Sequence, residues 1–127
     1  MPMVLASTGA SAVLIFGIPS SPVSHPWPIV GGHVISAFIG VSAYYLVANP
    51  ILAASLATCL AMLAMHFTRS MHPPGGATAV TAVIGGTTVH ELGYYFVIVP
   101  VLFNSIILLS VAMAAATFRE SNPFVDE

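Results

Sequence analysis

Residues Ile51–Phe67 read ILAASLATCLAMLAMHF, a run of apolar and small side chains with no Asp, Glu, Lys or Arg. At about 1.5 Å per residue, a helix of this length extends roughly 25 Å, close to the thickness of the hydrocarbon core of a bilayer. The rest of the chain is similar: 57% of its 127 residues are apolar and 5% are charged, and the mean hydropathy is +0.98. Soluble domains carry about 25% charged residues. The sequence therefore predicts an integral membrane protein embedded in the lipid bilayer.

The few charged residues exclude several function classes. They comprise two arginines and four acids, with no lysine and no charge before Arg69. Two positive charges cannot neutralise a phosphate backbone, so nucleic acid is excluded as a partner. No pair of carboxylates falls in the apolar region, and no serine lies in a nucleophile-elbow motif. We therefore expect neither an enzyme nor a resident cofactor.

Prolines and glycines divide the chain into five hydrophobic segments. A first interruption, Pro19–Pro28, contains four prolines and is expected to be a loop. A second interruption, Thr68–Thr78, precedes the fourth segment, and residues 86–91 are expected to form a polar turn. The predicted fold is an all-α bundle of transmembrane helices, in which the short first and fourth segments either cross the bilayer or are re-entrant. The five segments are 4–18, 29–47, 51–67, 75–84 and 92–118; they form one domain, 1–118, followed by a polar tail, 119–127.

The two interruptions resemble each other. The first contains His25-Pro26 followed by Gly31-Gly32, and the second contains His72-Pro73-Pro74 followed directly by Gly75-Gly76. Short Gly/Pro-broken segments in both halves of a membrane chain are typical of transporters with internal repeats. Chance similarity in a chain rich in Gly and Pro is the alternative.

The glycines after these prolines predict a site for an anion. The stretch from Pro74 through Gly75 and Gly76 to Thr78 is expected to begin a helix whose first N–H groups are free. The stretch Pro28–His33, which includes Gly31 and Gly32, provides a second such helix start. Two helix starts facing one cavity favour nitrite, nitrate or formate over a cation. The alternative is that the glycines only permit close helix packing, which we expect for Gly93, where valine should have a mild effect.

Five histidines are the groups that titrate near neutral pH. His72 precedes the predicted helix start, His25 holds the equivalent position in the first interruption, and His33 lies one turn into the second segment. An ionisable group within a membrane is by default a functional candidate, so these three are expected to contact the substrate or carry a proton. The alternative is that each caps a loop through a hydrogen bond. His66 is expected at the membrane interface and His90 in an exposed turn.

A membrane sensor that binds haem or a metal through histidines is the competing function. His25, His33 and His72 could meet at one metal ion, but they lack the i, i+4 spacing of a helical metal site. The single cysteine, Cys59, cannot supply a cysteine-based site. No metal ligand is therefore predicted.

Three blocks of sequence resemble the HPP family of small integral membrane proteins, named for its His-Pro-Pro signature. They are Thr68–Thr78, which reads TRSMHPPGGAT, Gly9–Pro22 and Pro26–Ala37. Family members usually carry another hydrophobic stretch before the Gly9 block, so the chain either lacks a helix or is a short form. Some chloroplast and cyanobacterial members are linked to nitrite transport, which implies a small-anion role here.

These inferences predict a transporter or channel for a small inorganic anion, with nitrite as the first candidate. The small size of the chain favours a homo-oligomer, and a bacterial inner membrane is the simplest location. If the first and fourth segments both cross the bilayer, Arg69 and Arg119 lie on the same side, which the positive-inside rule makes cytoplasmic. If the fourth segment is re-entrant, the two arginines lie on opposite sides.

Overall fold

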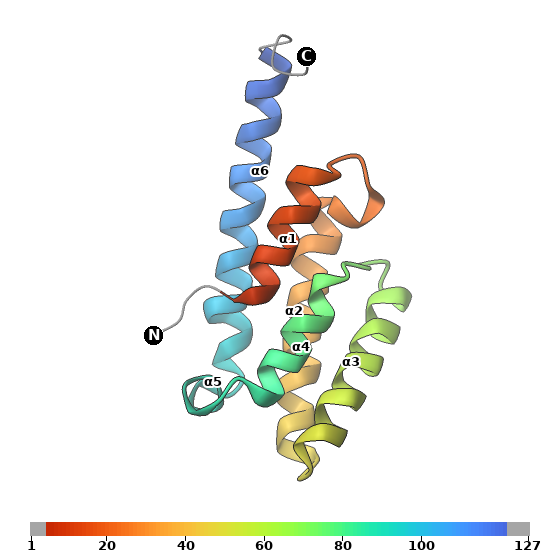
Figure 1. The fold of residues 1–127 in the computed structure, drawn as a ribbon, viewed down its shortest axis with the longest axis vertical. Helices are drawn as coiled ribbons and strands as arrows, with labels where there is room; N and C mark the ends of the chain where they lie inside the picture. The colour runs from red at the N-terminus through yellow and green to blue at the C-terminus, as the bar shows by residue number, and fades with distance from the viewer. Residues whose placement is uncertain (1–4, 122–127) are drawn as a thin grey trace.

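A computed structural model describes residues 5–121, and within this range the chain is helical and contains no strand. A single 3₁₀ turn, η1 (Pro22–Ser24), precedes α2, and a π-helical stretch, η2 (Val97–Leu102), precedes α6. The predicted all-helical fold is confirmed. Figure 1 shows the α-helices, which are α1 (Ala6–Gly17), α2 (Pro26–Leu46), α3 (Pro50–Phe67), α4 (Pro74–Ile84), α5 (Thr87–Leu92) and α6 (Phe103–Ser121).

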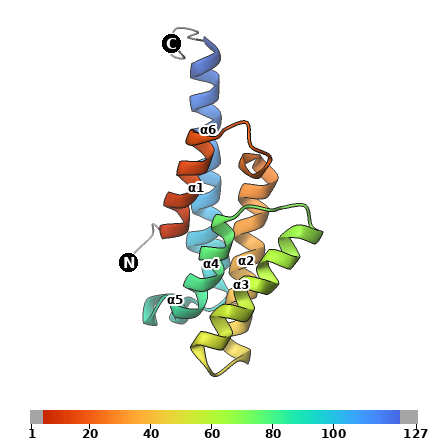
Figure 2. The same ribbon diagram turned by 45° about the vertical axis from the view of Figure 1, so that its right-hand side comes forward.

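Within residues 5–121, three helical stretches are long and apolar enough to cross a membrane: Pro26–Leu46, Pro50–Phe67 and Val97–Ser121. Helices α1 and α4 are apolar but shorter, as the sequence predicted. In Figure 1 the chain runs up α1, down α2, up α3, down α4 and up α6, and Figure 2 shows the same alternation after a turn of the molecule. The α1–α2 and α3–α4 connections therefore lie at one end of the bundle.

Both arginines of the topology prediction, Arg69 and Arg119, lie toward the end of the bundle that holds these two connections. Arg69 belongs to the α3–α4 connection, and Arg119 lies in the last turn of α6, which rises toward this end in both views. This is the arrangement expected if α1 and α4 both cross the bilayer. That this end faces the cytoplasm stays a prediction.

Helix α2 packs along both α3 and α4, and small residues make the approach possible. A Cβ at Gly40 of α2 would lie 2.5 Å from the Ala79 carbonyl oxygen and 2.6 Å from the Ala82 Cβ. Small residues let membrane helices approach closely where the hydrophobic effect cannot drive them together. The apolar core between the three helices is mostly alanine: Ala43, Ala53, Ala57, Ala61, Ala79 and Val83.

Large apolar side chains on α3 face outward, the reverse of a helix in a soluble protein. The buried side of α3 carries small residues and one methionine, whereas its leucines are exposed. Because lipid tails are as apolar as leucine, this distribution fits a helix that faces the bilayer. The exposed leucines of α3 are Leu52, Leu56, Leu60 and Leu63.

Two local features, the start of α2 and residues 86–91, differ from the sequence prediction. Helix α2 begins at Pro26 and not at 29, because Pro26 and Pro28 occupy its first turn, where a missing N–H is tolerated. The loop between α1 and α2 is therefore shorter than the first interruption. The predicted polar turn at 86–91 instead contains the short helix α5.

The fifth segment does not run straight from residue 92. Gly93 follows α5 with φ +54°, a backbone conformation that side chains rarely adopt, so the expectation that it tolerates valine is wrong. The backbone is also irregular at Val99 beside Pro100, and the regular helix α6 starts at Phe103. It continues to Ser121, past the predicted end at 118; residues 122–127 of the predicted tail lie outside the described residues.

Candidate functional site

His33 and His72 come together inside the bundle. His33 lies on α2 and His72 in the connection between α3 and α4. Their exposed fractions are 4% and 0%. The two ring centroids are 5.0 Å apart, and the rings meet edge to face at 68°. Two of the three histidines predicted to be functional therefore share one buried site.

Ser11 of α1 joins the two imidazoles. Its Oγ lies 2.6 Å from His33 Nε2 and 2.7 Å from His72 Nε2. The remaining ring nitrogens are also bonded: His33 Nδ1 lies 2.7 Å from Thr78 Oγ1, and His72 Nδ1 lies 2.6 Å from the Val23 carbonyl oxygen. We call this series of hydrogen bonds, Thr78–His33–Ser11–His72–Val23, the histidine chain.

The Val23 carbonyl fixes the direction of the histidine chain. A carbonyl oxygen only accepts, so His72 Nδ1 carries a hydrogen and donates it. His72 lies outside the membrane-spanning helices, and burial lowers its pKa below 6.5, against a smaller opposite effect of the Val23 hydrogen bond. His72 is therefore neutral near pH 7, and its Nε2 accepts the hydrogen of Ser11.

The other two bonds follow from the single hydrogen of Ser11. Because the Ser11 hydroxyl donates to His72, its oxygen accepts from His33 Nε2. A neutral His33 then has no hydrogen on Nδ1, which accepts from the Thr78 hydroxyl. Every hydrogen bond points from Thr78 toward Val23 when both histidines are neutral.

Two predicted glycines make room for this arrangement. A Cβ at Gly32 would lie 2.8 Å from His72 Cβ and 2.9 Å from the Ser70 carbonyl oxygen. A Cβ at Gly75 would lie 2.7 Å from Ser36 Oγ. These glycines allow the α3–α4 connection and the start of α4 to lie against α2, which brings His72 within reach of Ser11.

Gly31 and Gly76 contribute less to the site. A Cβ at Gly31 would lie 3.0 Å from the Trp27 ring and 3.1 Å from Ser70 Cβ. A Cβ at Gly76 would be in ordinary contact with Thr58, at 3.8 Å. The glycines of each pair, adjacent in sequence, thus differ in how closely they are packed.

The predicted free amides at the start of α4 are not observed. Pro73 and Pro74 have no N–H. The Gly75 N–H donates to the His72 carbonyl at 2.8 Å, and the Gly76 N–H donates to the Pro73 carbonyl at 3.0 Å. The prediction that these two amides are free to hold an anion is therefore wrong, because the first turn already uses them.

The start of α2 does not match its prediction either. Pro26 and Pro28 lack N–H groups, and the Ile29 N–H donates to the His25 carbonyl at 3.1 Å. Gly31 and Gly32 lie inside the helix and not at its start. The His25 side chain is exposed at the position before α2, away from the histidine chain.

A comparison with known sequences covers nearly the whole chain. It matches the family described as HPP, transmembrane region, over residues 1–124. The chain belongs to the HPP family. Two transmembrane proteins of Dictyostelium discoideum are 39% and 41% identical to it, over 98% and 94% of its length. The chain spans 45% and 40% of those two proteins, less than half of each. No solved structure matches it.

The HPP signature therefore has a clear position in this fold. Its histidine, His72, is the buried member of the histidine chain nearest η1. Pro73 occupies the position before α4, and Pro74 is the first residue of that helix. The predicted HPP resemblance and membrane location are confirmed.

Sequence reasoning missed Ser11, the residue that connects the HPP histidine to His33. Serines in membrane helices often bond their own backbone, so composition alone gives no signal. The spacing of the buried residues of α1 does contain a signal, because they recur at every fourth position: Ser7, Ser11 and Ile15. A stripe of this period on a short helix marks the face toward the bundle.

A small cavity of about 10 Å³ adjoins His33 on the side of α6. Its polar walls include Ser7, His33 and Asn104. Ser7 is 1% exposed, and its Oγ has no hydrogen-bond partner among residues 5–121. The volume is about that of one water-sized probe, so a single small polar molecule fits beside the histidine chain.

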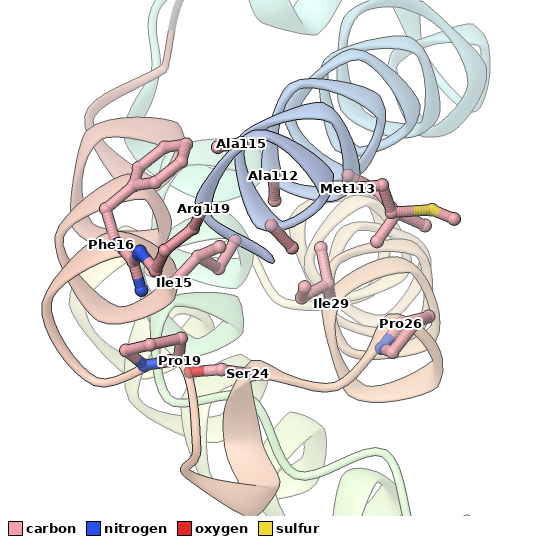
Figure 3. A pocket seen from close by; sticks show the side chains of 12 residues that line it. Ile15, Phe16, Pro19, Ser24, Pro26, Ile29, Ala112, Met113, Ala115 and Arg119 are labelled. Carbon is pink, nitrogen blue, oxygen red and sulfur yellow. The ribbon is translucent and has the colours of Figure 1, made fainter. Parts of the chain in front are cut away.

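A larger pocket of about 180 Å³ lies between α1, the α1–α2 connection and α6 (Figure 3). Its walls are mostly apolar, with Phe16 and Ile29 among them. Arg119 lines it from the last turn of α6, and Ser24, the neighbour of Val23, lines it from the connection. The pocket thus reaches the α1–α2 connection that contains Val23 and has one cationic wall.

The remaining two histidines lie elsewhere. His66 is exposed in the last turn of α3. His90 is not in an exposed turn as predicted: it is half-buried on α5, its Nε2 donates to the Val83 carbonyl at 2.8 Å, and its ring stacks on Tyr44 with centroids 3.8 Å apart. It fastens α5 to the end of α4.

Metal binding has no preformed site in the part of the chain that the structure describes. No group of three or more His, Cys, Asp or Glu side chains there could hold a metal ion. In this HPP chain both nitrogens of His33 and of His72 already have hydrogen-bond partners. A metal ion or haem iron would have to displace one of them.

Proposed function

We propose that this chain is the membrane domain of a transporter or channel for a small inorganic anion, with nitrite as the first candidate. The observation that carries the proposal is the histidine chain, a series of polar groups hydrogen-bonded inside an apolar bundle. Buried ionisable groups are costly in a membrane and mark substrate or proton pathways. The bond from His72 to Val23 alone would suffice to fasten a loop; the bonds through Ser11 to His33 and Thr78 go beyond that need.

The chemistry of the site favours an anion over a cation. Imidazole and hydroxyl groups present N–H and O–H donors, whereas a cation requires oxygen ligands that are mostly carboxylates. Helices α1, α2, α3 and α4 contain no Asp or Glu. The pocket between α1 and α6 adds the guanidinium of Arg119, a group whose paired donors suit the oxygens of a planar anion.

Nitrite is the first candidate because some HPP members are linked to its transport. Its small size also fits the pocket of about 180 Å³ between α1 and α6.

We also propose a homo-oligomer in a cell membrane. An open apolar groove of about 490 Å³ between α2 and α3 would face either lipid or a second copy of the chain. The bacterial inner membrane is the location proposed from the sequence. The two relatives come from Dictyostelium discoideum and support a membrane without supporting that compartment.

Uptake into proteoliposomes tests the proposed function. Nitrite, nitrate, formate and chloride are compared side by side for the wild type, for His33→Gln and for His66→Gln as a control at an exposed histidine. We expect saturable uptake with nitrite preferred, loss of uptake in His33→Gln, and uptake at the wild-type rate in His66→Gln. Folded wild-type protein that takes up none of the four anions would contradict the proposal.

A further inference from the structure

We propose that Ser11 is the switching hydroxyl of a proton relay, through which His72 receives a proton from the Thr78 end of the histidine chain. The inference rests on the proposed anion transport and deepens it, because it names the proton as the ion that moves with the anion. It stands on the bonding partners of the four ring nitrogens and on the surroundings of the two imidazoles.

The relay is polarised by the Val23 carbonyl. His72 Nδ1 already carries a hydrogen, held at 2.6 Å from that oxygen. The one lone pair of His72 that can take a proton is on Nε2, and it faces the Ser11 hydroxyl at 2.7 Å. A proton can therefore reach neutral His72 only through Ser11.

The transfer moves one proton without net loss of any hydrogen bond. A hydronium ion gives its proton to Thr78 Oγ1 and leaves as water, and the hydrogen that Thr78 carried passes to His33 Nδ1. The hydrogen on His33 Nε2 passes to Ser11 Oγ, and the Ser11 hydrogen passes to His72 Nε2. His72 is then an imidazolium with hydrogens on both nitrogens, and Thr78, His33 and Ser11 are again neutral. Each bond between Thr78 and His72 has reversed its direction.

The charge formed on His72 has no partner built into the surrounding helices. Of the elements packed around the histidine chain, α1, α2, η1, η2 and α4 contain no charged residue, and α3 contributes only the exposed His66. Helix α6 is charged only at its far end, at Arg119 and Glu120, and Arg69 of the α3–α4 connection is exposed. An anion bound near Val23 would balance the imidazolium. Proton uptake and anion binding therefore strengthen each other, as linkage requires.

The positions of the hydrogens provide a test that does not need transport. The full chain is labelled with ¹⁵N-histidine in phosphatidylcholine–phosphatidylglycerol bilayers at a pH of about 8, above the histidine range, and the signals are assigned with His33→Gln and His72→Gln. We expect opposite tautomers, with the hydrogen on Nδ1 in His72 and on Nε2 in His33. In Ser11→Ala, His72 should keep its tautomer while His33 loses its preference. The same tautomer for both histidines in the wild type would overturn the relay.

Proton movement provides the second test. Vesicles that contain a pH-sensitive dye receive an inward nitrite gradient, and the leak in protein-free vesicles is subtracted. We expect proton uptake with nitrite in the wild type, loss of both in Ser11→Ala, and recovery in Ser11→Thr, which keeps the hydroxyl. Ser55→Ala is the matched control, because Ser55 is exposed on α3 and bonds only the Ile51 carbonyl.

The two proposals fail in different ways. Nitrite uptake with unchanged proton movement in Ser11→Ala would overturn the relay and leave anion transport intact. Opposite tautomers in a wild type that takes up no anion would overturn the proposed function and the co-transport, while supporting the polarity of the hydrogen bonds.

Discussion

The connection before α2 and the connection before α4 lie at the same end of the bundle, and both contain a histidine followed by proline. In the first, the His25 side chain is exposed and the adjacent prolines form the first turn of α2. In the second, His72 is 0% exposed and bonds both Ser11 and the Val23 carbonyl. The side chain of His72 is buried, whereas that of His25 is exposed. Burial therefore makes His72 a member of the site.

The comparison also explains why the second connection is so closely packed. Gly32 of α2 faces the Ser70 carbonyl and His72, and Gly75 faces Ser36. No close packing of this kind surrounds His25, which stays at the surface. The difference therefore comes from the glycines that meet the second connection as well as from the histidine it contains.

Removal of the imidazole should give the largest difference in stability between the two connections. His72→Ala leaves the part-buried Val23 carbonyl without its partner and opens a cavity where the buried ring lay. Ser11 Oγ loses one of its two partners and keeps His33. We expect a loss of about 2–5 kcal/mol in the free energy of unfolding for His72→Ala, against less than about 0.5 kcal/mol for His25→Ala. Thermal unfolding of both variants in one detergent measures the difference. Equal melting temperatures would show that the His72 bonds contribute no stability.

The next largest difference in stability should be between alanine variants of the adjacent glycines Gly75 and Gly76. Alanine at Gly75 would meet Ser36 Oγ and the Gly32 carbonyl, at 2.7 and 3.0 Å, so we expect a loss of about 1–3 kcal/mol in unfolding free energy. Alanine at Gly76 has room, since its nearest neighbour is 3.8 Å away, and it should stabilise α4 by up to about 1 kcal/mol. The same melting experiment compares the two variants. A stable Gly75→Ala protein would contradict the close packing described here.

The far end of the histidine chain should show a smaller effect. Thr78→Val removes the hydroxyl that donates to His33 Nδ1 at 2.7 Å and should cost about 1 kcal/mol. Thr81→Val, one turn further along α4, removes a hydroxyl that bonds only the Ala77 carbonyl and should have little effect. If both variants lose the same stability, the Thr78–His33 bond is not a distinct contribution.

The smallest expected difference is in the pH dependence of stability, which distinguishes His72→Gln from His25→Gln. Burial holds the pKa of folded His72 below 6.5, the value in the unfolded chain, so the unfolded state binds a proton first as the pH falls. Stability should be complete above about pH 6.5 and decrease below it. Chemical unfolding between about pH 8 and pH 5 should show a weaker decrease in His72→Gln and an unchanged one in His25→Gln. An identical curve for His72→Gln and the wild type would assign the pH dependence to other groups.

Much of the fold could be predicted from the sequence because its signals are local. Hydrophobic runs and prolines identify the helices, and Pro50 and Pro74 are each the first residue of a helix. The prediction starts α2 too late because proline is typical of loops as well as of a first helical turn, where Pro26 and Pro28 lie. The sequence marks the irregular backbone before α6 through Pro100, whereas the positive φ at Gly93 has no local signature.

The site was only partly predictable because it depends on packing between distant segments. His33 and His72 were selected as ionisable groups in apolar sequence, but their convergence requires α1, α2 and α4 to meet. Ser11 lies far from both in sequence and is an ordinary residue of a membrane helix. The free amides expected at Gly75 and Gly76 failed because the carbonyls of His72 and Pro73 bind them, which a pattern of residue types does not reveal.

Nitrite uptake by His72→Gln and His25→Gln, measured in the same vesicles across the pH range of about 5 to 8, tests the central claim most directly. Glutamine can replace part of the hydrogen bonding of histidine but cannot take up a proton. We expect His25→Gln to transport as the wild type does, and His72→Gln to fold but lose the rise in uptake that follows protonation of His72 as the pH falls. Wild-type uptake by His72→Gln at every pH, or an equal loss in both variants, would contradict the account.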